Sequence, residues 1–352
     1  MSSDSRERVF CALEHKAPDR CPVDFWVESA TENTLKAHYG VKSFGELLDL
    51  FNVDMQFVFP PMKSEFAGVV WHSDGSWTDA SGKRMKRIKN AFSEYTETLY
   101  YPLQDMNGID EVRRYDKWPC ADAYDWAAFS DAIGKQNEKR VIKLHTGGLF
   151  ESAWSYRGQE RYLMDMALEP EIPRYIMGKL CDFWCEFVSR AMDAAGDKID
   201  IVYTYDDIAT QRGLIMSPKM LEEFVYPYHR RLNALIHGFG KRILYHSCGA
   251  VKSQIENLKN LPIDILNPLQ PAAEGMDFEE IKSEWGDALC FHGGIDIQST
   301  LPKGTPEEVR EAVRRAIRIL GRQGGYIMTS AHYIQNDTPV SNIEAMYDVS
   351  IR

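Results

Sequence analysis

A histidine and a cysteine two positions apart end an apolar run at residues 242–249, which read RILYHSCG. On a β-strand, residues i and i+2 project to the same face, so His246 and Cys248 are expected side by side. An imidazole and a thiolate can supply two ligands of a zinc ion, but zinc needs a third protein ligand that this segment lacks. The alternative is a small buried cysteine beside a hydrogen-bonded core histidine. The spacing alone leaves both interpretations open.

The elements that must position this pair are predicted from the pattern of apolar runs. Strands are expected near residues 22, 56, 141, 201, 243, 265, 290 and 327, and helical segments separate nearly all of them. Eight alternating strand–helix units predict a TIM (β/α)8 barrel that spans residues 1–352 as a single domain. An open doubly wound sheet is the main alternative, but the glycine-rich dinucleotide fingerprint after the first strand is absent.

Three local predictions accompany this fold. Residues 64–102 alternate short β-type runs with Asp-Gly and Ser-Gly turns, which predicts a β-hairpin insertion after the second strand. Helices are expected from about 149 to 196 with an interruption at Pro173, and as one long segment at 218–239. A closing helix is expected at 341–349.

Polar and aromatic side chains gather at the predicted strand ends, where a TIM barrel carries its active site. They are Asp24, Trp26, His145, Asp206, Asp207, Asn267, His292, Asp296 and His332. Each of them alone could instead cap a helix or fix a loop. The aromatic-rich segment 148–158, with Glu151 and Arg157, is compatible with a pocket wall and equally with the start of a packed helix.

Composition limits the classes of function. Hydrophobic residues make up 44% and charged residues 26% of 352, as in a globular protein with a sizeable core. A formal net charge of −11 disfavours nucleic acid and anionic membranes as partners. The seven cysteines are odd in number and scattered, so no disulfide framework is expected. The charged first twenty residues lack the apolar region of a signal peptide, and a cytoplasmic location is expected.

The chain resembles the uroporphyrinogen decarboxylase superfamily, particularly its corrinoid-dependent (methylcobamide) methyltransferase-like branch. The resemblance rests on LEHKAPDRCPVD at residues 13–24, YDDIATQ at 205–211, HSCG at 246–249 and SAHYIQ at 330–335. It implies a TIM barrel and an enzyme of one-carbon metabolism. Uroporphyrinogen decarboxylases carry paired arginines just after the first strand, whereas this chain has Asp24 and Trp26 there, so that activity is not expected.

The resemblance also implies a zinc site and its surroundings. Its pattern has a His-x-Cys pair and a later Cys on the last strand; His246 and Cys248 match the pair, and His332 stands where the later Cys would fall. Catalytic roles are expected for Asp207, Asn267 and His292, and substrate contacts for Asp24, Trp26, Glu151, Asp206 and Tyr333. The methyl group would move between a corrinoid (methylcobalamin) on a corrinoid-binding partner protein and a small-molecule donor or acceptor. A homodimer is compatible with these features.

Two other functions are considered. The first is a metal-free, decarboxylase-type lyase acting on a small acid, with Asp207 as the charged catalytic group and His332 as an acid or base. The second is a non-catalytic protein that binds a corrinoid or another small molecule. If Cys248 proves not to bind zinc, His292 with Asp206 and Asp207 is the next expected metal site.

Overall fold

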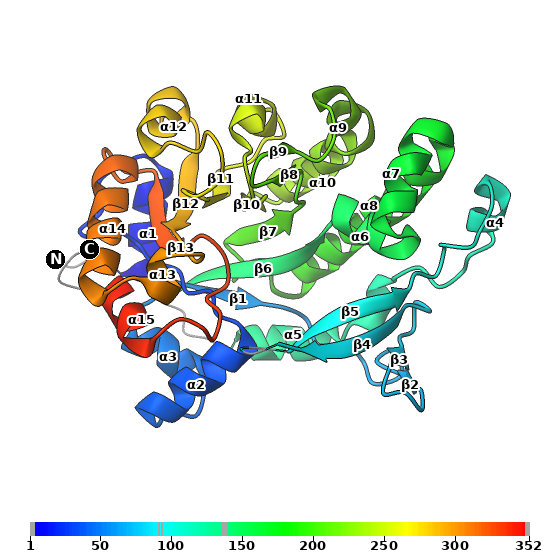
Figure 1. The fold of residues 1–352 in the computed structure, drawn as a ribbon, viewed down its shortest axis with the longest axis horizontal. Helices are drawn as coiled ribbons and strands as arrows, with labels where there is room; N and C mark the ends of the chain where they lie inside the picture. Colours follow the sequence, from blue (N-terminus) through cyan, green and yellow to red (C-terminus); the bar gives the residue numbers. More distant parts are fainter. Residues whose placement is uncertain (1–3, 91, 93, 135–139, 349–352) are drawn as a thin grey trace.

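Seven parallel strands form the curled sheet of this protein, whose computed structural model describes residues 4–90, 92, 94–134 and 140–348 (Figure 1). Their order is β1-β6-β7-β10-β11-β12-β13. The strands are β1 (Met55–Val58), β6 (Val141–Gly148), β7 (Ile201–Tyr205), β10 (Arg242–His246), β11 (Ile265–Leu269), β12 (Cys290–Ile295) and β13 (Tyr326–Ser330). Each strand lies next to the one that follows it in the barrel, and the arrangement confirms the predicted TIM-type fold.

The eighth barrel position is filled by a segment near residue 23 that is bridged rather than fully paired. Val23 bridges Met328 of β13 in parallel, and Val27 bridges Ile334. On its other side, the amide of Asp54, just before β1, donates to the Val23 carbonyl at 2.9 Å. The predicted strand at residues 21–26 is therefore present only as single bridges. Pro22 contributes to this, because it offers its carbonyl to Met328 but has no amide hydrogen to donate.

Helices cover the outside of the sheet (Figure 1). The first half of the chain contains α1 (Ser5–Leu13), α2 (Ser29–Tyr39), α3 (Phe44–Leu50), α4 (Ile109–Arg113), the 3₁₀ turn η1 (Ala121–Ala123), α5 (Trp126–Ile133), α6 (Phe150–Arg157), α7 (Gln159–Leu168) and α8 (Glu171–Ala195). The second half contains α9 (Pro218–Phe224), α10 (Tyr226–Gly238), η2 (Lys252–Gln254), α11 (Ile255–Lys259), α12 (Phe278–Trp285), α13 (Thr300–Lys303), α14 (Pro306–Leu320) and α15 (Val340–Met346).

Two of the helix predictions need correction. Pro173 does not interrupt a helix; it lies in the first turn of α8, where the amide hydrogen that proline lacks would have no partner within the helix. The predicted helix at 218–239 is divided at Val225 into α9 and α10. The expected closing helix is α15, which ends at Met346; residue 349 of that prediction lies outside the described residues.

The predicted hairpin insertion is confirmed as a separate antiparallel sheet of order β2-β3-β4-β5 that projects beside the barrel (Figure 1). Its strands are β2 (Val70–Trp71), β3 (Trp77–Thr78), β4 (Arg84–Lys89) and β5 (Glu94–Tyr100). A further short pair, β8 (Ala209–Thr210) and β9 (Gly213–Leu214), follows β7 near the barrel mouth.

Apolar side chains are buried in two layers. The larger one lies between the sheet and the helices. The smaller one fills the barrel interior with one or two residues from most strands: Met55, Val141, Ile201, Tyr203, Leu244, Ile265, Cys290 and Ile327, with Val9 and Leu13 of α1 and with Trp26. In the part of the chain that the structure describes, no helix combines the length and apolar character needed to cross a membrane.

Candidate active site

Three potential metal ligands meet at the carboxyl ends of β10 and β13. His246 is the last residue of β10, Cys248 follows two residues later, and His332 follows β13. The Cys248 Sγ atom lies 3.4 Å from His246 Nε2. One ligand atom from each of the three residues lies within 4.8 Å of the others. Ligand atoms at about 2.0–2.3 Å from a tetrahedral zinc ion lie roughly 3.3–3.8 Å apart, so the three side chains would need to move together by about an ångström to bind one ion.

The backbone around Cys248 explains why its side chain and that of His246 converge. Ser247 points the other way, and its Oγ accepts from the Ile208 amide at 3.1 Å. Gly249 then turns with a φ of +94°, and a Cβ atom there would come within 2.4 Å of the Thr210 carbonyl oxygen. Only glycine therefore fits this sharp turn after the cysteine. The backbone thus turns directly after the cysteine whose Sγ atom faces His246 Nε2.

The protonation states of the three side chains, as well as their positions, are relevant to zinc binding. Burial, together with the nearby His246, lowers the pKa of His332 to about 4, so the imidazole is neutral at pH 7. Burial, followed by the charges of Asp207 and Glu151, raises the pKa of the Cys248 thiol. Metal ligation requires neutral imidazole and thiolate, so a bound zinc ion would displace the thiol proton. The Asp207 carboxylate, 3.7 Å from His246 Nε2, adds negative charge that favours a cation here.

A line of hydrogen bonds supports His246 from below. Its Nδ1 lies 2.5 Å from Asn267 Oδ1, and Asn267 Nδ2 lies 2.6 Å from His292 Nδ1. His292 Nε2 in turn lies 3.0 Å from Asp24 Oδ2, and Lys143 forms an ion pair with the same carboxylate oxygen. This line, named here the buried relay, consists of His246, Asn267, His292, Asp24 and Lys143.

The buried relay corrects one expectation. Asp24, Trp26, Asn267 and His292 were expected to line the pocket, but each is at most 1% exposed. They lie beneath the ligand group because their polar atoms bond to one another: Trp26 Nε1 donates to Asp24 Oδ2 at 2.7 Å, and its ring stacks on that of His246. This placement supports a positioning role rather than direct contact with a substrate.

Asp206 and Asp207, adjacent in the sequence, have different surroundings. Asp206 is fully buried, and its carboxylate accepts from the amides of Leu149, Phe150 and Glu151 at the start of α6. His229 Nε2 lies 2.5 Å from the same carboxylate. With these four partners and no exposed surface, the Asp206 carboxylate has no access to a substrate. The expected substrate contact of Asp206 thus has no support in this geometry. Asp207 instead accepts from the Cys248 amide at 2.7 Å and has a 38% exposed side chain.

Glu151 is the third carboxyl group of this region. Its Oε1 accepts from the Asp207 amide at 3.0 Å. Burial, together with the charges of Asp206 and Asp207, raises the pKa of Glu151 to about 8. It therefore carries a proton at neutral pH, which makes it a candidate proton donor beside the ligand group.

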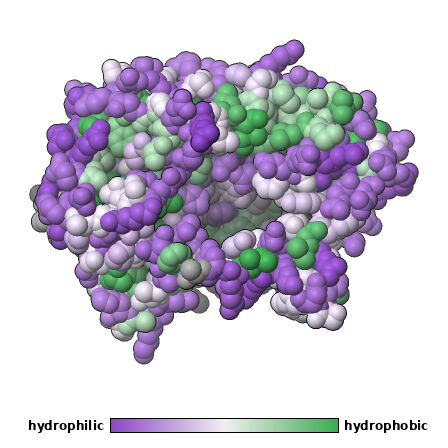
Figure 2. Space-filling model, viewed as in Figure 1, coloured by the Kyte–Doolittle hydropathy of each residue, from purple (hydrophilic) through white to green (hydrophobic). Residues whose placement is uncertain are grey.

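Aromatic rings form the wall above the buried relay. Tyr203, Tyr205 and His145 pack against one another, with ring centroids 5.0–6.1 Å apart. Tyr333 packs on Trp26 at 5.3 Å and on His332 at the same distance, which places it beside the ligand group; its substrate contact stays a prediction. Figure 2 shows a hollow near the centre of this face of the molecule, with apolar residues beside it.

Two other residues of interest in the sequence, Arg157 and Asp296, make contacts that hold the fold rather than the candidate site. Arg157 is fully buried, pairs with Asp165 at 2.7 Å and donates to the Met106 carbonyl at 2.6 Å, as expected of a packed helix. Asp296 accepts from the amides of Gln298, Ser299 and Thr300 and thereby holds the turn that leads into α13.

Sequence reasoning missed Lys143 and Gln270. Lys143 lies inside a strand whose neighbours are apolar, and a charged residue within a parallel barrel strand is the signal that could have identified it. Gln270 accepts from the Gly249 amide at 2.7 Å and from Gln211 Nε2 at 2.9 Å, so its own amide nitrogen faces Cys248 Sγ at 3.4 Å. No sequence pattern around Gln270 marks this contact.

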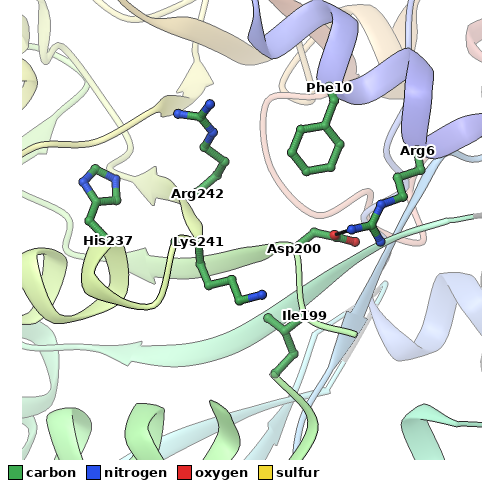
Figure 3. Close-up of a pocket in the computed structure, with 8 residues that line it drawn as sticks. Arg6, Phe10, Ile199, Asp200, His237, Lys241 and Arg242 are labelled. Atoms are coloured by element: carbon green, nitrogen blue, oxygen red, sulfur yellow. Dashed lines mark ion pairs between the residues drawn. The ribbon is translucent and has the colours of Figure 1, made fainter. Parts of the chain in front are cut away.

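A cavity of about 480 Å³ lies at the opposite end of the barrel, near the start of β7 and β10 (Figure 3). Its basic side chains are engaged: Arg6 pairs with Asp200 at 2.5 Å, and Arg242 pairs with Asp264 at 2.9 Å. TIM barrels place their chemistry at the carboxyl ends of the strands, so this cavity is not the candidate active site.

Comparison with known proteins supports the same fold. A uroporphyrinogen decarboxylase from Anaeromyxobacter sp. is 27% identical over 128 residues, which are 36% of this chain and 35% of that protein. A methylated-thiol–coenzyme M methyltransferase from Methanosarcina mazei is 28% identical over 131 residues, 37% of this chain and 32% of that protein. The matched parts thus span about a third of the length of either relative.

A solved structure extends the match to the whole fold. It is a methyltransferase from Methanosarcina mazei with a TM-score of 0.68 at 13% identity, covering 98% of this chain and 97% of that one. The sequence model of the family described as "Uroporphyrinogen decarboxylase (URO-D)" matches residues 147–351, more than half of the chain and a stretch that includes His246, Cys248 and His332. This chain therefore belongs to the uroporphyrinogen decarboxylase (URO-D) family.

Proposed function

We propose that this protein is a zinc-dependent methyltransferase that moves a methyl group between a corrinoid on a partner protein and a small methyl donor or acceptor. The observation that carries the proposal is the convergence of His246, Cys248 and His332 within 4.8 Å at the barrel mouth. The methyltransferase among the curated relatives supports it. When bound, zinc would act as a Lewis acid that lowers the pKa of a thiol acceptor or polarises a methyl donor.

The side chains around the ligand group have separate tasks in this proposal. His246, Cys248 and His332 hold the ion, and Gln270 donates to the Cys248 sulfur, which stabilises a thiolate there. Tyr205 and Tyr333 provide apolar surface for the body of a small substrate. Buried surroundings raise the pKa of Glu151 to about 8, so its carboxyl group can donate a proton to a leaving group.

Transfer from the corrinoid to a thiol defines the bonds that change. The carbon–cobalt bond breaks with both electrons left on cobalt, which passes from cobalt(III) to cobalt(I). The acceptor sulfur forms the new bond to the methyl carbon and loses its proton. The exposed Asp207 carboxylate accepts that proton and passes it to solvent. Transfer in the other direction, from a methylated donor to cobalt(I), would form the carbon–cobalt bond and break the bond between the methyl carbon and the donor atom, with the protonated Glu151 supplying a proton to the departing group.

The test is a spectroscopic assay with purified, zinc-loaded protein, methylcobalamin and a panel of small thiols under anaerobic conditions. We expect loss of the methylcobalamin absorbance and appearance of cob(I)alamin with at least one acceptor. Cys248→Ser should abolish turnover, whereas Cys120→Ser, which changes an exposed cysteine elsewhere, should not. A folded, zinc-loaded protein that gives no spectral change with any acceptor or corrinoid partner would refute the proposal.

A metal-free lyase is the second candidate. The observation that favours it is the protonated Glu151 next to Asp207, a carboxylic acid and a carboxylate at one mouth. Elemental analysis of protein purified without chelator separates the candidates. Zinc in equimolar amount favours the methyltransferase, and a metal-free preparation with decarboxylase activity on a small acid favours the lyase.

A further inference from the structure

Lys143 is a buried cation in the middle of β6, and its ammonium group faces the barrel interior. The side chain has no exposed surface. The ammonium pairs with Asp24 and lies 3.8 Å from the centroid of the Phe57 ring, which adds a cation–π contact. An ion pair this deeply buried gains little net stability on average.

The ion pair sets the direction of hydrogen bonding at its end of the buried relay. Asp24 accepts from the Phe25 amide at 2.9 Å, from Trp26 Nε1 at 2.7 Å and from Lys143. These donors favour the carboxylate. Burial, the largest single influence, raises the pKa of Asp24, but the charge of Lys143 and the hydrogen bond from His292 outweigh it, so the pKa is lowered. A carboxylate only accepts, so the His292 Nε2 atom 3.0 Å away must carry the hydrogen.

This direction passes along the rest of the relay. With its hydrogen on Nε2, a neutral His292 has a lone pair on Nδ1, which accepts from Asn267 Nδ2 at 2.6 Å. The Asn267 oxygen must then face His246 Nδ1 at 2.5 Å, which therefore carries the hydrogen. The lone pair of His246 is left on Nε2, the atom that faces Cys248 Sγ and the position of a metal ion.

We propose that Lys143 is a positioning residue: through Asp24, His292 and Asn267 it holds His246 in the Nδ1–H tautomer, with the Nε2 lone pair directed at the metal position. The benefit of this tautomer rests on the proposed function, because only a bound metal ion would use the Nε2 lone pair. The tautomer of His246 itself can be measured in metal-free protein.

Loss of the Lys143 charge should reverse the direction of the hydrogen bonds along the buried relay. Without the cation, the buried Asp24–His292 pair takes up a proton, either on the carboxylate or on the imidazole, because an unpaired buried charge is costly. When the imidazole holds this proton, or when the protonated carboxyl group donates to His292 Nε2, His292 Nδ1 becomes a donor, the Asn267 amide turns over, and its nitrogen donates to His246 Nδ1. The hydrogen of His246 then lies on Nε2, where it blocks the metal position.

The experiment compares Lys143→Met with Lys282→Met. Lys282 is another buried lysine; it donates to the Gly324 carbonyl at 2.8 Å and has no contact with the relay. The first readout is the histidine tautomer from long-range ¹⁵N–¹H correlation spectra of metal-free protein, with the His246 signal identified by its loss in His246→Gln. The second readout is zinc affinity by competition with a chelator.

We expect Lys143→Met to move the His246 hydrogen to Nε2 and to weaken zinc binding by about 10- to 100-fold, the usual effect of losing a partner of a metal ligand. Lys282→Met should change neither readout. Adding Asn267→Asp to Lys143→Met should restore both, because a carboxylate at position 267 accepts from His246 Nδ1 whatever the state of Asp24.

Each outcome decides the inference. A folded Lys143→Met variant with the Nδ1–H tautomer and unchanged zinc affinity overturns it. Weaker zinc binding without a change of tautomer, or without rescue by Asn267→Asp, would show that Lys143 only supports the fold. If the parent protein binds no zinc, the proposed function fails, while the tautomer comparison still tests the role of Lys143.

Discussion

Replacing Glu151 by glutamine should stabilise the protein, and increasingly so as the pH rises. Burial and the charges of Asp206 and Asp207 raise the pKa of Glu151 from 4.5 to about 8. Between these two values the folded chain binds a proton at this site that the unfolded chain has released. The free energy of unfolding therefore falls by about 1.4 kcal/mol per pH unit across this window, or by about 5 kcal/mol over all of it.

Glutamine has no proton to lose and can still accept from the Asp207 amide through Oε1. The difference in unfolding free energy between Glu151→Gln and the parent should thus grow by about 3 kcal/mol from pH 5.5 to pH 7.5. Urea unfolding followed by circular dichroism, with chelator present, measures it. Glu160→Gln, at an exposed position on α7, is the control and should show no comparable growth. Parallel pH profiles for Glu151→Gln and the parent would refute the argument.

Three further predictions concern the ligand group and the fold. In metal-free protein at pH 8, Cys248 should react with iodoacetamide more slowly than the exposed Cys120, because burial raises its pKa; peptide mass spectrometry that finds Cys248 modified first would contradict this. His332→Cys should retain zinc and His332→Ala should bind it more weakly, since thiolate and imidazole are both good ligands; equal metal content in the two variants would place the third ligand elsewhere. Arg157→Met should lower the free energy of unfolding by about 3 kcal/mol, because the buried Asp165 carboxylate keeps only the more exposed Arg161 as a cationic partner and the Met106 carbonyl loses its donor; a loss below about 1 kcal/mol in urea unfolding would show that this ion pair is not a structural requirement.

The barrel could be predicted from the sequence because its strands are short apolar runs with helices between them. The period of a strand predicted that His246 and Cys248 lie side by side, and the structure places their ligand atoms 3.4 Å apart, although β10 ends at His246 and Cys248 lies beyond the strand. The predicted strand near residue 22 was less successful. Proline and the single bridges of Val23 and Val27 give that segment its place in the barrel without regular pairing.

The depth of each polar residue was harder to predict. A strand end says that a side chain lies near the mouth, but whether it faces the substrate depends on partners from other strands. Asn267 and His292 are buried because they bond to each other, and Asp206 is buried because the start of α6 supplies three amide hydrogens to it. Such contacts join residues far apart in the chain, and local patterns do not encode them.

Barrel closure between Val23 and β13 has a consequence for synthesis of the chain. Val23 and Met328 lie far apart in the chain, so the barrel can close only after the segment around Met328 has been made. His332 emerges with that same segment, whereas His246 and Cys248 have emerged earlier. A nascent chain would therefore present only two of the three candidate ligands. A metal ion held by all three candidate ligands would therefore bind only after the segment that closes the barrel has been made.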